Sequence, residues 1–199
     1  MNIFYNKNGI GDTLIIALTD IENRTYERKG NVAKIFDQDS GTVAGYNIFS
    51  ISEQLQIDAV GQVELTEALI EKINEIIKQN GFDDQLDADL SPKFVVGYVE
   101  TKEKHPNADQ LSICTVNVGA EQLQIVCGAP NVDAGQKVVV AKVGAVMPSG
   151  LVIKDAELRG VASSGMICSA RELALPNAPE EKGILVLADE EYKIGQEFK

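Results

Sequence analysis

Histidine and cysteine are scarce in this sequence: 199 residues contain one histidine, three cysteines and no tryptophan. A single histidine, His105, excludes metal sites built from several imidazoles, and no two cysteines have the spacing of a Cys-x-x-Cys pair. Cys114, Cys127 and Cys168 are widely separated and lie among apolar residues, a pattern typical of buried, reduced thiols. We therefore expect neither a metal ion nor a cofactor.

Long apolar runs and catalytic motifs are also absent. No window approaches the roughly 18 to 20 apolar residues that span a bilayer, and the first residues lack the basic and apolar regions of a signal peptide. There is no phosphate-binding loop and no nucleophile elbow. Cys127 is the one candidate nucleophile, but its apolar neighbours place it in a buried strand. The sequence predicts a cytoplasmic protein without membrane contact that is not an enzyme and has no catalytic residues.

Positive charge is scarce overall, and the formal net charge is -12. An acidic protein is repelled by phosphate backbones at long range, so this balance alone argues against nucleic acid. The charge is unevenly distributed, however. Residues 1–92 carry 7 Lys and Arg against 16 Asp and Glu, a net charge of -9, and residues 93–199 carry 11 against 14, a net charge of -3. The acidity belongs mainly to the N-terminal half.

Residues 1–90 predict an α+β domain. Short apolar segments separated by turns indicate a small antiparallel sheet, with a hairpin around residues 29–31. Apolar residues recur at helical spacing over residues 66–79, where Thr66 is a suitable N-cap and Asn80-Gly81 a suitable stop. We expect the apolar stripe of this one long helix to cover a face of the sheet rather than to bind a partner.

The segment from residue 83 to 92 is acidic and ends in proline, which predicts a linker and a domain boundary. Its simplest interpretation is a solvated connection. An alternative is that the acidic run covers a basic groove of the protein when RNA is absent.

Residues 93–198 predict a second domain made only of strands. Four segments are short and β-branched, and glycine-rich turns separate them. They cover residues 94–100, 112–118, 123–127 and 137–141. Such strands close most economically into a small barrel, because an open sheet would leave its edges exposed.

Three motifs in this half resemble a known family. Residues 102–109 read Lys-Glu-Lys-His-Pro-Asn-Ala-Asp, residues 124–131 read Gln-Ile-Val-Cys-Gly-Ala-Pro-Asn, and residues 158–173 contain Ser-Ser-Gly-Met. They are similar to the tRNA-binding OB-fold domain found at the front of the phenylalanyl-tRNA synthetase β subunit, in some methionyl-tRNA synthetases and in stand-alone proteins. With the acidic domain in front, the chain is most similar to the YtpR type of tRNA-binding protein. The resemblance implies an α+β domain followed by an all-β OB-fold barrel.

The resemblance also implies a function, the non-catalytic binding of folded tRNA by shape and backbone contacts. It assigns Asn107 and Ser163 to hydrogen bonds with sugar or phosphate, Gly165 to a close backbone approach, and Met166 to packing on a base or ribose. The residues also have structural interpretations. The loop around His105 could only shape a strand connection, and Met166 could belong to the core.

Four cations lie next to the motifs and are candidates for phosphate contacts: Lys102, Lys104, Lys142 and Arg171. We expect tRNA as the partner and no binding of DNA. Stand-alone relatives imply a homodimer through residues 184–198, and an aminoacyl-tRNA synthetase is a further candidate partner. The competing hypothesis is a protein-interaction or dimerisation module of the translation machinery that has lost strong RNA affinity.

Overall fold

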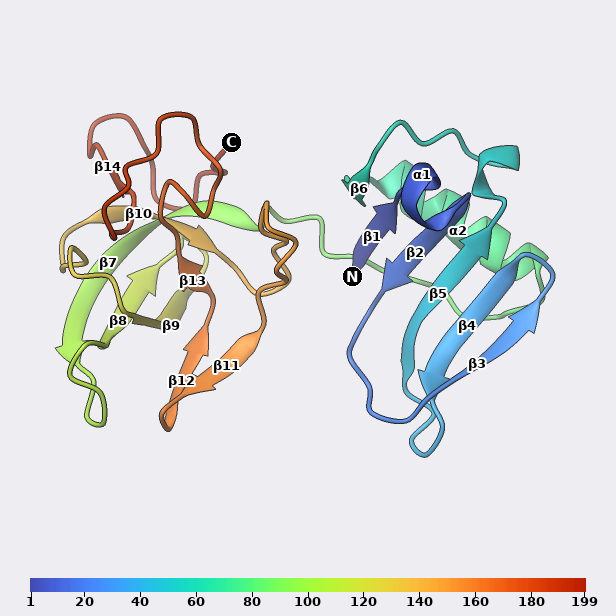
Figure 1. Ribbon diagram of the computed structural model, residues 1–199, viewed down its shortest axis with the longest axis horizontal. Helices are drawn as coiled ribbons and strands as arrows, with labels where there is room; N and C mark the ends of the chain where they lie inside the picture. The colour runs from blue at the N-terminus through green and yellow to red at the C-terminus, as the bar shows by residue number, and fades with distance from the viewer. The chain divides into compact units, whose positions relative to one another are not determined.

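The computed structural model describes residues 1–199 and divides into two compact units, Met1–Ser91 and Pro92–Lys199. Both units consist mostly of β-strands, and the first also has one long helix (Figure 1). None of the helices has the length and apolar character needed to cross a membrane.

The first unit is built on a six-stranded antiparallel sheet with the order β3-β4-β5-β2-β1-β6. Its strands are β1 (Asn2–Tyr5), β2 (Thr13–Ala17), β3 (Arg24–Lys29), β4 (Val32–Asp37), β5 (Val43–Phe49) and β6 (Gly61–Val63). The four-residue helix α1 (Lys7–Ile10) follows β1, and a 3-10 turn η1 (Ile51–Glu53) follows β5. The expected hairpin is confirmed, because only Gly30 and Asn31 separate β3 from β4.

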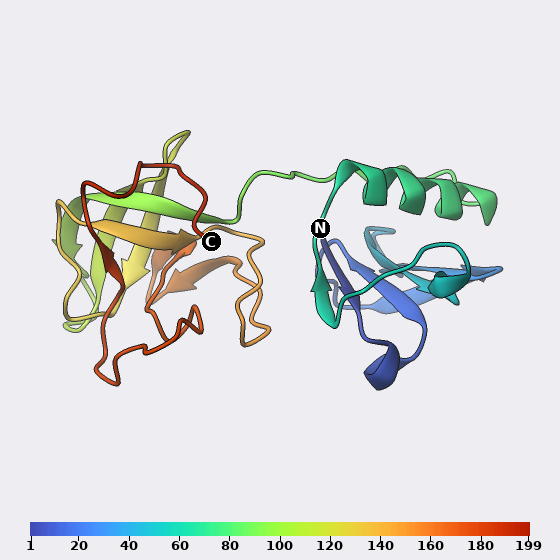
Figure 2. The same cartoon turned by 90° about the horizontal axis from the view of Figure 1, so that it is seen from above.

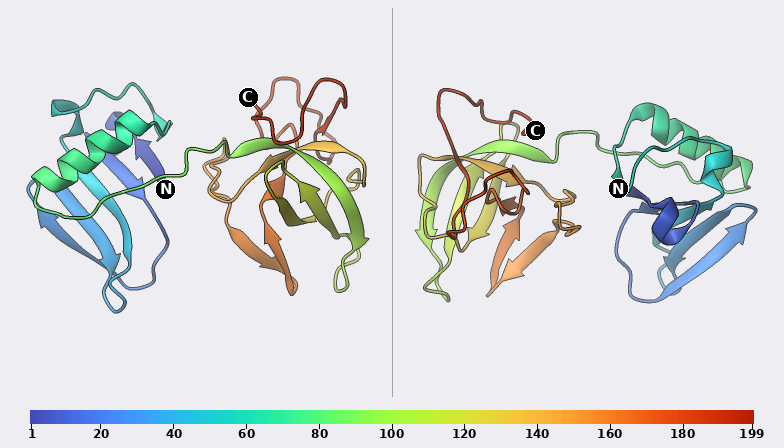
Figure 3. Two further views of the ribbon diagram at one scale, coloured as in Figure 1. Left: turned by 180° about the vertical axis from the view of Figure 1, so that it is seen from behind. Right: turned by 45° about the horizontal axis from the view of Figure 1, so that its top comes forward.

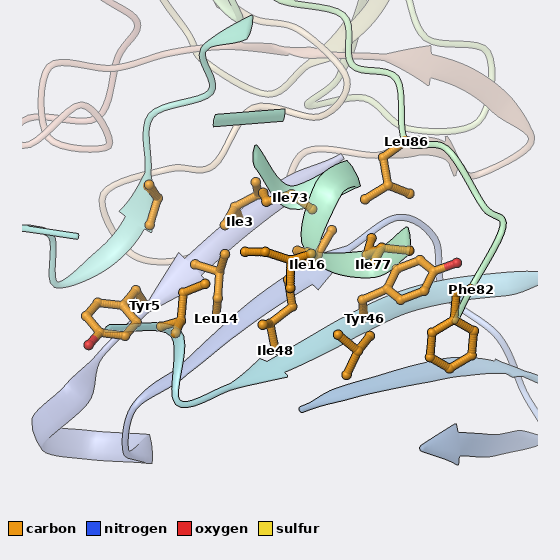
Figure 4. Close-up of a cluster of buried hydrophobic side chains, with 14 residues drawn as sticks. Ile3, Tyr5, Leu14, Ile16, Tyr46, Ile48, Ile73, Ile77, Phe82 and Leu86 are labelled. Carbon is orange, nitrogen blue, oxygen red and sulfur yellow. The ribbon is translucent and has the colours of Figure 1, made fainter. Parts of the chain in front are cut away.

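The long helix α2 (Glu67–Gln79) covers one face of this sheet, as expected (Figures 2 and 3). The Thr66 hydroxyl accepts a hydrogen bond from the Leu69 amide at 3.2 Å, and Gly81 adopts a positive φ of 85° just beyond the helix. Ile73 and Ile77 of α2 point into the side chains of the sheet (Figure 4). Burial of each such isoleucine stabilises the fold by about 1.5 to 3 kcal/mol.

The acidic segment after α2 differs from the expected solvated connection. Phe82 and Leu86 are buried in the core of the first unit. Leu86 exchanges main-chain hydrogen bonds with the Asn74 side chain at 2.7 and 2.9 Å, and Asp84 accepts from Lys34 at 2.7 Å. That expectation is therefore wrong for residues 83–86, because apolar residues within the acidic run anchor it to its own domain. The Asp84 carboxylate is likewise paired with a side chain of its own domain.

The second unit has four main strands close to the predicted positions: β7 (Phe94–Lys104), β8 (Ser112–Asn117), β9 (Gln122–Cys127) and β10 (Lys137–Ala141). Two shorter strands, β11 (Asp155–Leu158) and β12 (Val161–Ser164), form a separate hairpin. The remaining strands are β13 (Met166–Ile167) and β14 (Val186–Leu187). The main sheet has the order β13-β10-β7-β8-β9, and β14 also pairs with β10.

This sheet is open, so the expectation of a closed barrel is wrong. Its two edges are β13 and β9, and no ladder of main-chain hydrogen bonds joins them. The strand available to close the sheet is short: β13 is only two residues long, and Gly165, with a φ of 117°, separates it from β12. The last part of the chain is likewise no continuous strand. It contributes β14 and an isolated bridge between Val95 and Glu197.

All three cysteines are buried and free, as predicted. Burial raises the pKa of Cys114 to about 11 and that of Cys168 to about 12, and it also raises the pKa of Cys127. Reactive cysteines need a lowered pKa and an exposed, electropositive setting. These thiols instead pack as small apolar side chains in the two hydrophobic clusters of the second unit.

Candidate nucleic-acid interface

The structure joins two of the sequence motifs through the single histidine. His105 is 2% exposed, and its Nε2 lies 3.0 Å from the carbonyl oxygen of Leu158. Its Nδ1 accepts a hydrogen bond from the Asn107 amide at 3.1 Å. Because a carbonyl oxygen only accepts and an amide only donates, these contacts require the neutral imidazole with its proton on Nε2. His105 is thus a buried connection between the β7–β8 loop and the β11–β12 hairpin.

Asn107 lies on the exposed side of this connection. Its Nδ2 donates to the carbonyl oxygen of Arg159 at 3.3 Å, so the amide group is oriented by the hairpin. The residue is exposed, and its side-chain hydrogen bond uses Nδ2 and not Oδ1. The two loops lie at the same end of the second unit (Figure 1). Asn107 therefore has the placement expected of a contact residue.

Arg159 lies within the third sequence motif but is not among the four cations selected from the sequence. It stands at the tip of the β11–β12 hairpin with φ 49°, followed by Gly160 with φ 86°. Two positive φ values in a two-residue connection are typical of a type I′ turn. The exposed Arg159 side chain makes no ion pair. The signal in the sequence was the Arg-Gly pair between two short strands, a hairpin turn that carries a cation.

Ser163 occupies a different position from the one expected of an RNA contact. It is 4% exposed, and its hydroxyl accepts a hydrogen bond from the Val126 amide at 3.0 Å. Nearby, the Gln124 side chain donates to the carbonyl oxygen of Ala162 at 2.7 Å. These two side-chain hydrogen bonds connect β12 to β9, which are not joined by a ladder of main-chain hydrogen bonds. The structure gives Ser163 the role of fastening the β11–β12 hairpin, and direct contact with RNA stays a prediction.

Gly165 and Met166 come directly after strand β12 in the chain. A Cβ atom on Gly165 would lie 3.0 Å from the carbonyl oxygen of Ala141, so the close approach here is to strand β10 of the protein itself. Met166 pairs with Ala141 in the sheet and is half-buried. One side of it packs against a core cluster, and it also lines a pocket. Met166 therefore combines the core role and the surface role that the sequence left open.

Three of the four predicted cations are engaged with carboxylates. Lys142 Nζ lies 2.9 Å from Glu121, and the distances for Lys104 to Asp109 and Lys102 to Asp133 are 3.1 and 4.0 Å. Exposed ion pairs of this kind contribute only about 0 to 1 kcal/mol. A phosphate group could therefore replace the carboxylates at small cost, but the pairs weaken the positive potential of the unliganded surface.

The fourth cation, Arg171, belongs to a pocket of about 700 Å³. Its walls come from the end of β9, from β13, and from residues 169–172 and 179–186. The Arg171 guanidinium donates to the carbonyl oxygen of Glu180 at 3.3 Å and has no carboxylate partner. Asn131 exchanges two hydrogen bonds with the main chain of Ile184, at 2.8 and 3.0 Å, which fixes one wall.

The lining of this pocket combines apolar and charged side chains. Val126, Met166 and Ile167 supply apolar surface, and the two cations Arg171 and Lys182 are balanced by two glutamates, Glu172 and Glu181. The carboxylate of Glu172 is held by the Ser169 amide and hydroxyl, both at 2.7 Å. No group of three or more His, Cys, Asp or Glu side chains is arranged to hold a metal ion.

The predicted residues thus fall into two sets that the structure brings together separately. Asn107 joins Arg159 at the hairpin tip, and Met166 joins Arg171 at the pocket. Ser163 and Gly165 lie in the stretch between them as structural supports. Lys102, Lys104 and Lys142 each stand beside a carboxylate.

Comparison with known proteins identifies the class of this second unit. Residues 94–197 match the family described as "Putative tRNA binding domain", a binding module and not an enzyme. Residues 19–89 match a separate family, "Domain of unknown function (DUF4479)". The tRNA-binding match covers more than half of the chain.

The full-length relative is more specific. "Putative tRNA-binding protein YtpR" of Bacillus subtilis (strain 168) is 65% identical over 201 aligned residues, covering 100% of both chains. The chain therefore belongs to the YtpR family of putative tRNA-binding proteins.

Two further similarities are partial. The phenylalanine–tRNA ligase β subunit of Campylobacter jejuni (strain RM1221) is 50% identical over 134 residues, which cover 66% of this chain and only 17% of that subunit. Among solved structures, the C-terminal domain of Plasmodium vivax p43 aligns with 55% of this chain and 61% of that chain, at 27% identity and a TM-score of 0.39.

Proposed function

We propose that this protein binds structured tRNA through its C-terminal unit, by shape and backbone contacts and without catalysis. The observation that carries the proposal is the joining of two separate motifs by His105, which presents Asn107 beside the unpaired Arg159 at one end of the unit. Membership of a family whose domain is described as tRNA-binding supports it. The proposed role of each site residue follows from its exposure and its hydrogen bonds.

The contacts that we propose suit the chemistry of folded RNA. A-form helices hide most base edges and display phosphates and 2′-hydroxyl groups. The Oδ1 of Asn107 would accept a hydrogen bond from a 2′-hydroxyl, and Arg159 would contact a phosphate. In the pocket, Met166 would pack on an unpaired base or ribose while Arg171 faces its phosphate. Ser163 and Gly165 would act by holding β12 and β13 in place.

We also propose that the C-terminal unit is a variant of the OB-fold, a five-stranded barrel that is commonly only partly closed. The five-stranded path β13-β10-β7-β8-β9 supports this assignment. The gap next to β9 is bridged by the side chains of Ser163 and Gln124 rather than by a strand ladder. For the N-terminal unit, the proposed fold class is an α+β domain in which α2 covers the six-stranded sheet.

The proposal extends to assembly and location. We place the protein in the cytoplasm as a homodimer formed through residues 184–198, with a synthetase as a further candidate partner. Val186 and Ile194 support the dimer, since they are exposed apolar side chains in this segment at 44% and 39%. Sedimentation equilibrium of a Val186→Glu/Ile194→Glu variant tests it. The wild type should sediment as a dimer and the variant as a monomer, and a monomeric wild type would refute the dimer.

The test of the binding proposal is the salt dependence of affinity for bulk tRNA and for duplex DNA of similar length. We expect a preference for tRNA and a log K that falls linearly with log salt. An Arg159→Gln/Arg171→Gln variant should reduce the slope by about 1 for each phosphate contact that is lost. A matched Lys72→Gln/Lys78→Gln variant removes two charges from α2 and should bind as the wild type does. Absence of tRNA binding at low salt would refute the proposal.

A protein-interaction module is the second candidate function. The pairing of Lys102, Lys104 and Lys142 with carboxylates favours it, together with the net charge of -12. The same titration separates the two candidates. Equal and weak binding of tRNA and DNA, with no effect of the Arg159→Gln/Arg171→Gln variant, would favour the interaction module.

A further inference from the structure

The six-stranded sheet of the first unit has a second face that no helix crosses. Figure 1 views the unit from this side, with α2 behind the sheet and the short α1 at the end of β1 and β2. The strand register assigns residues to this open face, because residues directly opposite each other point the same way. One row, from β3 to β6, consists of Arg28, Ala33, Asn47, Ile15, Phe4 and Gln62.

The neighbouring row on the open face brings in an exposed aromatic ring. Tyr26 is opposite Ile35, which is opposite Gly45. The Tyr26 side chain is 70% exposed. Phe4, Ile15 and Ile35 are half-buried, and they belong neither to the core cluster under α2 nor to the side chains packed against it. The open face is therefore a partly apolar surface that the core of the unit does not use.

Strand β3 places an alternating pattern along one side of this face. Arg24, Tyr26 and Arg28 are all exposed and point the same way, with successive side chains about 7 Å apart along the strand. The Arg28 guanidinium carbon lies 4.4 Å from the centroid of the Phe49 ring, and its Nε donates to the carbonyl oxygen of Gly30 at 3.2 Å. Arg28 is thus held in position, and the Arg24 side chain is unpaired.

The strand residues of this face include more positive than negative side chains. The strands place two arginines on it and one carboxylate, Asp37, which is 9% exposed. Asp37 already accepts hydrogen bonds from the main chain of Asn23, Asp39 and Ser40. Seven of the 16 acidic residues of residues 1–92 lie elsewhere, three glutamates in α2 and four aspartates in residues 83–89. Within a unit of net charge -9, the strand residues of the open face therefore carry a local excess of one positive charge.

We propose that this open face binds an unpaired stretch of RNA, with the Tyr26 ring stacked on a base and Arg24 and Arg28 contacting the phosphates on either side. Unpaired bases expose their flat faces, and stacking on aromatic rings recognises them without regard to sequence. A sheet face with one projecting ring suits such a strand better than a duplex, whose bases are already stacked. This site lies in the N-terminal unit and is additional to the proposed tRNA interface of the C-terminal unit.

The test uses the full chain and a fluorescein-labelled 12-nucleotide uridine RNA, with an RNA duplex of the same length for comparison. Tyr26→Ala should weaken binding of the single strand at least about fivefold, the lower end of the cost of losing one stacked base. Tyr26→Phe keeps the ring and should bind as the wild type does. Arg24→Gln/Arg28→Gln should reduce the slope of log K against log salt by about 1.4, since each phosphate contact on a single strand contributes about 0.7.

The controls separate this site from the C-terminal interface. Lys72→Gln/Lys78→Gln removes the same charge from the helix side and should leave the single-strand affinity unchanged. Arg159→Gln/Arg171→Gln should weaken bulk tRNA and spare the uridine RNA. If it spares both while Tyr26→Ala loses the uridine RNA, the proposed function of the C-terminal unit fails and this site stands.

Three results would overturn the open-face site. The first is equal binding of the uridine RNA by the wild type and Tyr26→Ala, and the second is loss of that binding only in Arg159→Gln/Arg171→Gln. The third is a change in sedimentation of Tyr26→Ala with unchanged RNA affinity, which would identify the face as a contact between copies of this chain. Thermal unfolding of each variant confirms that the chain remains folded, which the 70% exposure of Tyr26 leads us to expect.

Discussion

His105 and Leu158 are 53 residues apart in the chain and are joined by a hydrogen bond of 3.0 Å between imidazole Nε2 and carbonyl oxygen. The imidazole is buried, and its contact with Leu158 joins the β7–β8 loop to the β11–β12 hairpin. Asn107 and Arg159 lie directly beside it, so the geometry of the proposed tRNA contact depends on a residue that would itself touch no RNA.

Replacing His105 should therefore lower both stability and affinity. His105→Ala removes two hydrogen bonds, each contributing about 0.5 to 1.5 kcal/mol, and leaves a cavity where the 2% exposed imidazole was packed. We expect a loss of at least about 2 kcal/mol in the unfolding of the second unit, measured by urea denaturation followed by amide signals of that unit. An Ala substitution at the exposed Pro106 should have little effect. Unchanged stability of His105→Ala would show that the connection contributes little.

Ser163→Ala should loosen the attachment of the β11–β12 hairpin to β9. The substitution leaves the Val126 amide without its acceptor, at a cost of about 1 to 3 kcal/mol. Hydrogen exchange of that amide should become faster in the variant. Ser164→Ala is the matched control, because the Ser164 hydroxyl makes no hydrogen bond within the chain. Equal exchange rates at Val126 in the two variants would contradict the structural role of Ser163.

Gly165→Ala should destabilise the second unit by more than about 1 kcal/mol, because a side chain is strained at positive φ and has no room here. The φ of Gly165 is 117°, and the added Cβ would lie 3.0 Å from the Ala141 carbonyl oxygen. Gly150→Ala separates the two effects, because Gly150 has φ 87° with no atom within 4 Å of the added Cβ. Calorimetric unfolding should show the larger loss for Gly165→Ala. A larger loss of stability for Gly150→Ala than for Gly165→Ala would mean that a Cβ atom on Gly165 is not crowded by strand β10.

Acid should destabilise the first unit through Asp37. Main-chain hydrogen bonds, first from Ser40 and then from Asn23, hold the pKa of this carboxyl below its ordinary value of 3.8. A carboxyl with a lowered folded-state pKa contributes stability above its unfolded pKa, and this contribution is lost as the pH falls through the folded pKa. Unfolding of the first unit measured between pH 6 and about pH 3 should show this loss.

Two variants test the assignment to Asp37. Asp37→Asn should flatten the pH profile below about pH 4, because the titrating carboxyl is gone. Asp83→Asn is the control and should leave the profile as in the wild type. A profile of Asp37→Asn that is parallel to that of the wild type would assign the acid sensitivity to other groups.

The elements that local chemistry determines were predictable from the sequence. Thr66 and Gly81 mark the ends of α2, and the four β-branched segments of the second unit became its main strands. What could not be predicted depends on contacts between distant residues. Leu86 in the acidic run is bonded to the distant Asn74, and the edge of β9 is joined to β12 through the side chains of Ser163 and Gln124.

The residues of the candidate site likewise divide into those that the motifs identified and those whose role depends on the fold. Asn107 and Arg171 were found from the motifs, and the structure places both at exposed positions, each bonded to a main-chain carbonyl oxygen. Ser163 fits the same motif but is buried, because a short polar side chain next to the unpaired β9 amide of Val126 satisfies that group. Arg159 was not selected, because its importance comes from the hairpin that brings it to Asn107.

The most direct measurement of the central claim is the hydrogen-exchange footprint of bulk tRNA on the full chain at low salt. The account predicts slower exchange in residues 105–111, 158–161 and 169–186, and no such protection in an Arg159→Gln/Arg171→Gln variant at the same tRNA concentration. Binding of tRNA that leaves exchange in these three segments unchanged would contradict the account.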